Sequence, residues 1–276
     1  MANHHRNGKV YLVGGGPGDP ELLTLKAHKV LQSSDVIIYD ALINPEVLKY
    51  AHPKAQLIFI GKSRSKERLS QKAVERLMIL HAKQGKTVAR LKGGDPFIFG
   101  RGGEEVEALA EAGIKWEVVP GISAGHALPA YAGIPLTHRN YAANVAFITG
   151  HEAANKNSSI DWEKLATAID TLVIFMGAKN LPQIISRLVM AGRAPSTPIA
   201  IIERGTLADQ RIRISTLATT LATLIDDPIQ TPALIIIGEV VKLREQLSSE
   251  YKPFEINKLW KRKVSSAGVL VESIID

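Results

Sequence analysis

The sequence predicts an α/β protein made of two α/β domains with a cleft between them. Short apolar, β-branched runs alternate with amphipathic helical stretches, which is typical of layered α/β folds. Several runs are apolar at every position, as in strands covered by helices on both faces. The chain of 276 residues is long for one domain and sufficient for two. The expected strands are Val10–Val13, Val36–Tyr39, Leu57–Ile60, Val88–Leu91, Trp116–Val119, Val145–Thr149, Leu172–Met176, Ile199–Ile202 and Leu234–Ile237.

The helices between these strands carry recognisable start and stop residues. Serine and aspartate side chains accept hydrogen bonds from the free N–H groups of a first turn, and glycine adopts the left-handed conformation that often ends a helix. Pro182 fits a first helical turn. The expected N-caps are Ser70, Asp161 and Ser215, and the expected terminating glycines are Gly85, Gly113 and Gly192.

The segment Val119–His138 is the expected domain boundary. It contains several glycines and three prolines, and it separates five expected strands from at least four. We therefore expect an N-terminal α/β domain over residues 8–121 and a C-terminal α/β domain over residues 122–246. Residues 247–276 have no clear place in the repeat and are treated as an extension of unknown role.

Composition excludes several classes of protein. With no cysteine, the chain has no disulfide, cysteine-ligated metal or thiol catalysis. The first residues lack a hydrophobic secretion signal, and no apolar run approaches the roughly 18 residues of a membrane span, so a cytoplasmic protein is expected. The net charge of +7 and the pI of about 9.5 indicate an anionic partner. Basic residues are dispersed except for the cluster Lys258–Lys263, which we interpret as a solvated tail rather than an RNA or membrane contact.

The loop after the first strand reads GGGPGD and leads into a helix. Gly14 and Gly16 match a dinucleotide fingerprint, but Asp19 occupies its third glycine position, and Pro17 removes an N–H from the cradle that would hold a pyrophosphate. A tight turn without a ligand is the alternative. The loop therefore favours a nucleotide-like ligand that has no pyrophosphate.

A second glycine cluster, RLKGGDPFIFGRGGEE, again follows a strand and precedes a helix. Gly93 and Gly94 allow the backbone to approach a ligand closely. Asp95 offers acceptors to hydroxyl groups or a cation, and Arg101 offers a planar cation suited to carboxylates. The alternative is a helix-entry loop with a capping aspartate, but the two Gly-Gly pairs beside Asp95 and Arg101 favour a ligand site.

Two polar residues follow apolar strands. Asp40 comes after VIIY, and Lys62 comes after IFIG. The carboxyl ends of strands line the ligand crevice in an open parallel sheet, so a carboxylate and an amine there are suited to proton exchange with a substrate. The eight histidines lack metal-ligand spacing, and no metal site is predicted.

In combination, these blocks resemble the tetrapyrrole methylase family. The resemblance runs in register from about Val10 to about Val241. Two of its blocks, GGDPFIFGRGGEE and PAYAGIPLTHR, are too long for coincidence. The complete set also contains VGGGPGDPELLTLKA, DVIIYDALINPEVL, GK at Gly61–Lys62, VVPGISAGH, VIFMG and TPALIIIGEVV.

The resemblance implies a homodimer with the tetrapyrrole methylase fold (class III methyltransferases) and S-adenosylmethionine in the interdomain cleft. It implies two successive methyl transfers to uroporphyrinogen III, yielding precorrin-2 and S-adenosylhomocysteine, and no nucleic-acid or membrane partner. Asp40 matches the family's proton acceptor and Lys62 its proton donor. Because the substrate carries eight carboxylates, Arg101 and Arg139 are the expected substrate contacts. The cofactor contacts carry over onto Pro17, Gly93, Gly94, Asp95, Ile98, Ser123, Ala124, Met176 and Gly205.

Several alternatives stay open at this level. A methylase for a later corrin intermediate would share the glycine blocks, and the basic pI leaves room for a cofactor-binding protein that acts on RNA. The sequence also does not choose between sirohaem and cobalamin synthesis. The charged segment SRSKERLSQKA after Lys62 departs from the family pattern, so the substrate contacts there are open too.

Overall fold

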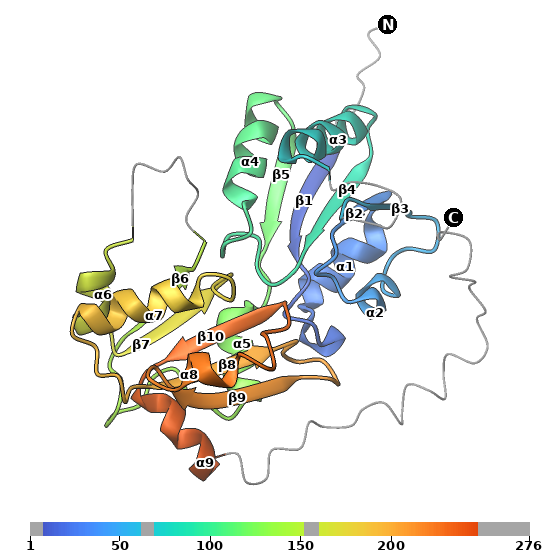
Figure 1. Cartoon of the computed structure of the whole chain (residues 1–276). Coiled ribbons are helices and arrows are strands. Elements are labelled where there is room, and N and C mark those ends of the chain that lie inside the picture. The colour runs from blue at the N-terminus through green and yellow to red at the C-terminus, as the bar shows by residue number, and fades with distance from the viewer. Residues whose placement is uncertain (1–7, 62–68, 152–159, 248–276) are drawn as a thin grey trace, which may run out of the picture.

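The computed structural model describes residues 8–61, 69–151 and 160–247. They form two five-stranded sheets, each with its own helices, which lie one above the other in the view of Figure 1. Lys62 and the cluster Lys258–Lys263 lie outside the described residues. Among the described helices, none is both long enough and apolar enough to cross a membrane.

The first sheet is entirely parallel, with strand order β3-β2-β4-β1-β5. Its helices α1 and α2 pack on one face, and α3 and α4 pack on the other (Figure 1). Because both faces are covered, its central strands are apolar on both sides, as the sequence pattern predicts. The strands are β1 (Lys9–Gly14), β2 (Val36–Tyr39), β3 (Gln56–Phe59), β4 (Thr87–Lys92) and β5 (Lys115–Val119), and the helices are α1 (Leu25–Ser33), α2 (Pro45–Leu48), α3 (Gln71–Lys83) and α4 (Gly102–Glu111).

The neighbouring strands β1 and β4 mark the switch point of this sheet. The chain leaves β1 through α1 toward β2 on one side, and it leaves β4 through α4 toward β5 on the other. The two connections diverge at the carboxyl ends of these strands, where open α/β sheets bind their ligands. The two glycine clusters of the sequence follow these two strands.

The second sheet is mixed, with strand order β6-β7-β10-β8-β9. Strands β6 and β7 are parallel, whereas β10 runs antiparallel to β7 and β8, and β9 runs antiparallel to β8. Helices α6 and α7 cover one face, and α5 covers the other. The strands are β6 (Val145–Thr149), β7 (Thr171–Phe175), β8 (Pro198–Glu203), β9 (Arg211–Thr216) and β10 (Ala233–Ile237), and the helices are α5 (Ala124–Tyr131), α6 (Trp162–Ala168), α7 (Leu181–Met190), α8 (Thr220–Thr223) and α9 (Arg244–Leu247), with 3₁₀ turns η1 (Pro20–Leu22) and η2 (Glu239–Leu243).

The predicted helix caps are confirmed in two places and wrong in a third. Ser70 and Asp161 accept hydrogen bonds from the backbone N–H groups of Ala73 and Lys164. Ser215 does not cap a helix, because it lies in β9, a strand absent from the sequence prediction. The helix expected after it shrinks to the four residues of α8. The segment RIRIS alternates charged and apolar residues, which is typical of a strand. The threonine- and alanine-rich stretch after it favours a helix, and the sequence prediction followed that second pattern.

Candidate active site

The two glycine clusters form one structure at the switch point of the first sheet. The N–H of Gly16 donates to the carbonyl of Gly94 at 3.2 Å, and the N–H of Gly94 donates to the carbonyl of Gly16 at 2.7 Å. The loop that follows β1 and the loop that follows β4 are therefore bonded to each other. Both expected ligand-binding loops are held at one point of the sheet edge.

The glycines are needed first for contact between backbones. A Cβ on Gly14 would lie 2.7 Å from the carbonyl oxygen of Gly94, and a Cβ on Gly121 would lie 2.6 Å from the Cα of Gly14. Gly94 has space around it, but its φ of +67° lies in the left-handed region that favours glycine. The sequence pattern assigns Gly14 and Gly94 to a ligand, and the structure adds that these two glycines and Gly121 let three loops meet.

Asp95 joins the second and third of these loops. Its Oδ1 accepts from the N–H of Phe97 at 2.8 Å, and its Oδ2 accepts from the N–H of Gly121 at 2.9 Å. A carboxylate has about four lone-pair sites, so two remain for ligand hydroxyls. Asp95 thus positions the loop and retains the acceptors predicted for it.

Asp40 stands at the end of a buried chain of charges. Its Oδ2 accepts from Arg90 Nη2 at 3.1 Å, and Arg90 Nε donates to Glu105 Oε1 at 3.1 Å. Lys92 Nζ lies 2.9 Å from Glu105 Oε2. The side chain of Glu105 is fully buried, whereas that of Asp40 is 22% exposed. We call Asp40, Arg90, Glu105 and Lys92 the first charge network, and Asp40 is its exposed end.

Burial lowers the pKa of Lys92 in this network. The positive charge of nearby Arg90 lowers that pKa further, whereas the negative charge of Glu105 raises it. Two acidic and two basic groups give the network no net charge. The sequence pattern did not identify these partners, although Arg90 and Lys92 stand out as charges at alternate positions of a strand that is otherwise apolar.

Asp19 connects the first glycine loop to the second sheet. Its N–H donates to Thr206 Oγ1 at 2.9 Å, and its Oδ2 accepts from the Tyr131 hydroxyl at 2.8 Å. Its Oδ1 caps the 3₁₀ turn η1 by accepting from the N–H of Glu21. At the third glycine position of the fingerprint, Asp19 therefore has a structural role: its hydrogen bonds join the first glycine loop to the second sheet. Its partners are Tyr131 and Thr206, which lie more than a hundred residues away along the chain. No local sequence pattern indicates these contacts.

Among the described residues, the non-glycine residues with left-handed backbone gather in three loops. They are Phe99, Arg101, Met176, Arg204 and Thr206. Such conformations cost on the order of 1–3 kcal/mol each and cluster at functional sites. Met176 and Gly205, both predicted cofactor residues, lie in two of these loops. The ring of Phe99 lies 4.9 Å from that of Phe175, so the loop after β4 contacts the end of β7.

The other predicted cofactor contacts differ in burial and in the element that carries them. Ser123 is buried and caps α5 by accepting from the N–H of Gly125, and Ala124 begins that helix. Pro17 lies in the first glycine loop. Ile98 and Met176 are partly exposed, at 38% and 53%.

The two predicted substrate arginines are both accessible. Arg101 is half-exposed and pairs with Glu104. Arg139 is exposed on a turn closed by the bridge between His138 and Ala142, and it makes no ion pair within the described part of the chain. No group of three potential metal ligands occurs among residues 8–61, 69–151 and 160–247.

Taken together, the edge of the first sheet presents a carboxylate on a neutral buried network, two mutually bonded glycine loops and accessible apolar and cationic side chains. It meets the second sheet through Asp19 and Phe99. Cavities of 180 Å³ beside α7 and 400 Å³ beside α5 are lined by other residues. The arrangement is suited to holding a small ligand against an acceptor for protons.

Comparison with known proteins gives consistent matches. The sequence profile of the Tetrapyrrole (Corrin/Porphyrin) Methylases matches residues 9–221. Uroporphyrinogen-III C-methyltransferase of Priestia megaterium is 51% identical over 234 residues, which cover 85% of this chain and 98% of that protein. The Bacillus subtilis protein of the same name is 49% identical over 254 residues, covering 91% and 99%. The crystal structure of uroporphyrin-III C-methyltransferase from Thermus thermophilus with S-adenosylhomocysteine has a TM-score of 0.74 at 39% identity and covers 86% of this chain and 100% of its own.

Proposed function

The chain belongs to the family of tetrapyrrole methylases, and we propose that it is an S-adenosylmethionine-dependent uroporphyrinogen-III C-methyltransferase. In this function it adds two methyl groups in succession to uroporphyrinogen III and releases precorrin-2. The observation that carries the proposal is the 51% identity over 98% of the length of a relative with this activity in its name. The glycine loops, Asp40 and the exposed arginines provide the parts that such a reaction needs.

The loops fit a methyl donor that has no phosphate. Pro17 removes a backbone N–H where a pyrophosphate cradle would need one. Asp95 retains acceptors for ribose hydroxyls, and Ile98 and Met176 offer exposed apolar surface for the adenine ring and the aliphatic part of the methionine chain. The residues proposed to hold S-adenosylmethionine are Pro17, Gly93, Gly94, Asp95, Ile98, Ser123, Ala124, Met176 and Gly205.

The bound cofactor supplies an activated methyl group, so the chain's main task is to align donor and acceptor. A pyrrole carbon that accepts a methyl group becomes part of a cationic ring and must lose a proton. We assign proton acceptance to Asp40, whose carboxylate is oriented by Arg90 and by the N–H of Leu42. Lys62 is the proposed proton donor.

Arg101 and Arg139 are the proposed contacts for substrate carboxylates. The pair between Arg101 and Glu104 is half-exposed on both sides and therefore contributes little on its own. An incoming carboxylate can replace Glu104 with little loss. A bidentate pair between guanidinium and carboxylate would then fix the macrocycle.

An anaerobic assay with uroporphyrinogen III and S-adenosylmethionine tests the activity, with the number of added methyl groups read by mass spectrometry. We expect a dimethylated product, and the absence of any methylated tetrapyrrole would overturn the proposal. The same assay with later corrin intermediates tests the substrate assignment.

The variant Asp40→Asn tests the role of the carboxylate. The amide keeps an acceptor for the N–H of Leu42 but removes the base. We expect kcat to fall about 100-fold or more, as on loss of a general base, while calorimetry shows unchanged binding of S-adenosylhomocysteine. Asp226→Asn, an exposed aspartate outside the site, is the control. Wild-type turnover in Asp40→Asn would remove Asp40 from the mechanism.

The same proposal includes a homodimer in the cytoplasm and the division of the chain into domains 8–121 and 122–246. The homodimer follows from the resemblance to the family, the domain division from the glycines and prolines of Val119–His138, and the cytoplasmic location from composition. Sedimentation equilibrium tests the dimer, and limited proteolysis tests the boundary.

A further inference from the structure

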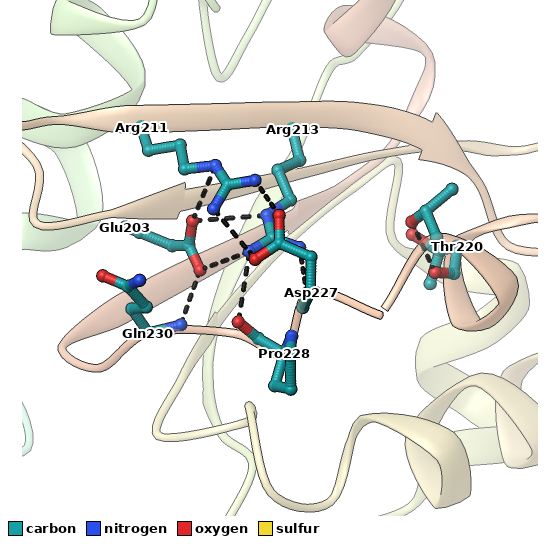
Figure 2. A network of polar contacts seen from close by, with 8 residues as sticks. Glu203, Arg211, Arg213, Thr220, Asp227, Pro228 and Gln230 are labelled. Atoms are coloured by element: carbon teal, nitrogen blue, oxygen red, sulfur yellow. Dashed lines mark hydrogen bonds and ion pairs between the residues drawn. The ribbon is translucent and has the colours of Figure 1, made fainter. Parts of the chain in front are cut away.

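A second group of charges lies at the edge of the second sheet where β8 ends and β9 begins. Glu203 closes β8, and its side chain is 1% exposed. Its Oε1 accepts from Arg213 Nη2 at 3.1 Å and from the N–H of Gln230 at 2.6 Å. Asp227 pairs with Arg213 at 3.2 Å and also with Arg211. Figure 2 shows Glu203, Arg211, Arg213 and Asp227 turned toward one another, and we call these four residues the second charge network.

This network holds both ends of the turn 204–210. Glu203 immediately precedes the turn, and Arg211 immediately follows it and lies opposite Glu203 in the β8–β9 register. Within the turn, Arg204 pairs with Asp209, and the N–H of Thr206 donates to Gln210 Oε1 at 2.8 Å. The turn is therefore closed at its base by ion pairs and braced internally by side chains.

The turn needs such external support because its backbone is strained. Arg204 has a φ of +49° and Thr206 a φ of +65°, and both lie in the left-handed region that non-glycine residues avoid. The N–H of Arg204 also donates to the carbonyl of Pro232 at 2.9 Å, in the same 227–232 segment that the arginines hold. Contacts of Glu203 and Asp227 thus maintain a conformation that the local sequence does not favour.

The top of the turn reaches the proposed cofactor site. Thr206 Oγ1 accepts from the N–H of Asp19, the residue that ends the first glycine loop. Gly205, a proposed cofactor contact, lies between the two strained residues, and any side chain on it would overlap Leu128 of α5. Displacement of the turn would therefore move Gly205 and loosen the loop that carries Pro17.

We propose that Glu203 and Asp227 are positioning residues for S-adenosylmethionine, acting through the turn 204–210. They touch neither ligand nor reacting atoms. Their charges fix Arg211 and Arg213, which fix the base of the turn, and the turn presents Gly205 and holds Asp19. This inference rests on the proposed function, because it takes the cofactor and its contacts from there.

The first test is the variant Glu203→Gln. The amide has nearly the same shape and still accepts from the N–H of Gln230, but it lacks the charge that faces the two arginines. We expect the dissociation constant of S-adenosylhomocysteine, measured by calorimetry, to rise about fivefold or more, the scale of coupling between residues of one network. At saturating S-adenosylmethionine, kcat should stay near the wild-type value, because the reacting groups are untouched.

The control is Ile185→Val, which removes a buried methyl group from α7 in the same sheet's core without touching the turn. This variant should lower thermal stability and leave the affinity unchanged. If the affinity falls in both variants in proportion to stability, the network only stabilises the fold and the proposal is overturned. Asp227→Asn, at a half-exposed position, is measured in the same way should Glu203→Gln not fold.

A double-mutant cycle of Glu203→Gln with Thr206→Val tests whether Glu203 acts on cofactor binding through the turn. Valine keeps the shape of threonine but cannot accept from the N–H of Asp19. If Glu203 acts through the turn, the double variant should bind S-adenosylhomocysteine little worse than the weaker single variant. Fully additive losses of affinity would contradict an action of Glu203 through the turn.

The binding measurements also separate this inference from the proposed function. Wild-type protein that fails to bind S-adenosylhomocysteine would refute the proposed function. Wild-type and Glu203→Gln proteins that bind it equally would refute only the positioning role.

Discussion

The two sheets carry charge networks of matching composition. In the first, Arg90 and Lys92 project from alternate positions of β4 toward Glu105 and Asp40. In the second, Arg211 and Arg213 project from alternate positions of β9 toward Glu203 and Asp227. Each network has one buried glutamate, one more accessible aspartate and no net charge.

The networks differ in burial. The side chains of Arg90 and Lys92 are both 6% exposed, in a central strand covered on both faces. Arg211 and Asp227 are each 45% exposed, at the edge of their sheet. An ion pair that is buried leaves an uncompensated charge when one partner is removed, whereas an exposed one is replaced by water. Substitution should therefore be tolerated much better at Arg211 and Asp227 than at Arg90 and Lys92.

The largest expected effect is that of Arg90→Met. Removing this guanidinium leaves Glu105 buried with Lys92 alone and frees Asp40, so we expect the free energy of unfolding to fall by about 3–5 kcal/mol. Urea denaturation measures the loss, and kcat should fall with it because Asp40 loses its orientation. The same replacement at the exposed position, Arg211→Met, should cost much less, because water replaces the lost ion pair. Equal losses would refute the burial argument.

A second prediction concerns the glycines at the edge of the first sheet, where the backbones of neighbouring loops touch. A methyl group in Gly121→Ala would collide with the backbone of Gly14, which cannot turn away as a side chain can. We expect a loss of about 1–3 kcal/mol, as in other overpacked sites, and weaker binding of S-adenosylhomocysteine. Gly103→Ala is the control, because no atom lies within 4 Å of the position that its methyl group would take. Unchanged stability in Gly121→Ala would show that the loops adjust independently.

The two networks should also respond to opposite ends of the pH scale. Burial lowers the pKa of Lys92 below its usual 10.5. At a pH between the lowered value and 10.5, the unfolded chain keeps a proton that the folded chain has lost, so the free energy of unfolding should rise with pH there. Urea denaturation at increasing alkaline pH measures the slope. Lys92→Met should be less stable overall but show a flatter slope, and an unaltered slope would contradict the assignment.

The smallest effect is expected in acid. The hydrogen bond from Arg211 is the main cause that lowers the pKa of Asp227 below its usual 3.8. Stability from this pair is present above pH 3.8 and is lost as the pH falls through the lowered pKa. Because the pair is exposed, salt should weaken the effect. Unfolding midpoints of wild type and Arg211→Gln should therefore converge in acid, and a constant gap would show that Asp227 contributes nothing.

Local pattern predicted most of the fold. All nine expected strands are present, with ends shifted by no more than one residue, because each is a run of apolar residues bounded by turn residues. The missed strand β9 carries the alternating pattern RIRIS, but the threonine- and alanine-rich stretch after it led to the prediction of a helix instead. The ion pairs of Arg211 and Arg213 with Glu203 join β9 to β8, and local composition does not show such a partner.

The residues of the candidate site also divide into those that the local sequence indicates and those that it does not. Glycine spacing located the loops, and Asp40 was visible as a polar residue directly after an apolar strand. Arg90, Tyr131 and Thr206 were not identified, because their importance lies in partners 50 to 187 residues away. The strained backbone of Met176 and Thr206 also depends on tertiary contacts and leaves no mark in the sequence.

Strand β9 has a consequence for how the protein behaves in concentrated solution. It is an edge strand, so one row of its backbone N–H and C=O groups is open to pairing with another molecule, and Ile214 on it is 44% exposed. Charged side chains are a common protection of such edges against aggregation. Arg211, whose side chain is 45% exposed, supplies that protection, while both arginines hold the turn. An apolar replacement of both would leave an uncharged isoleucine-rich ladder, and the protein should then self-associate even where its sheets remain folded.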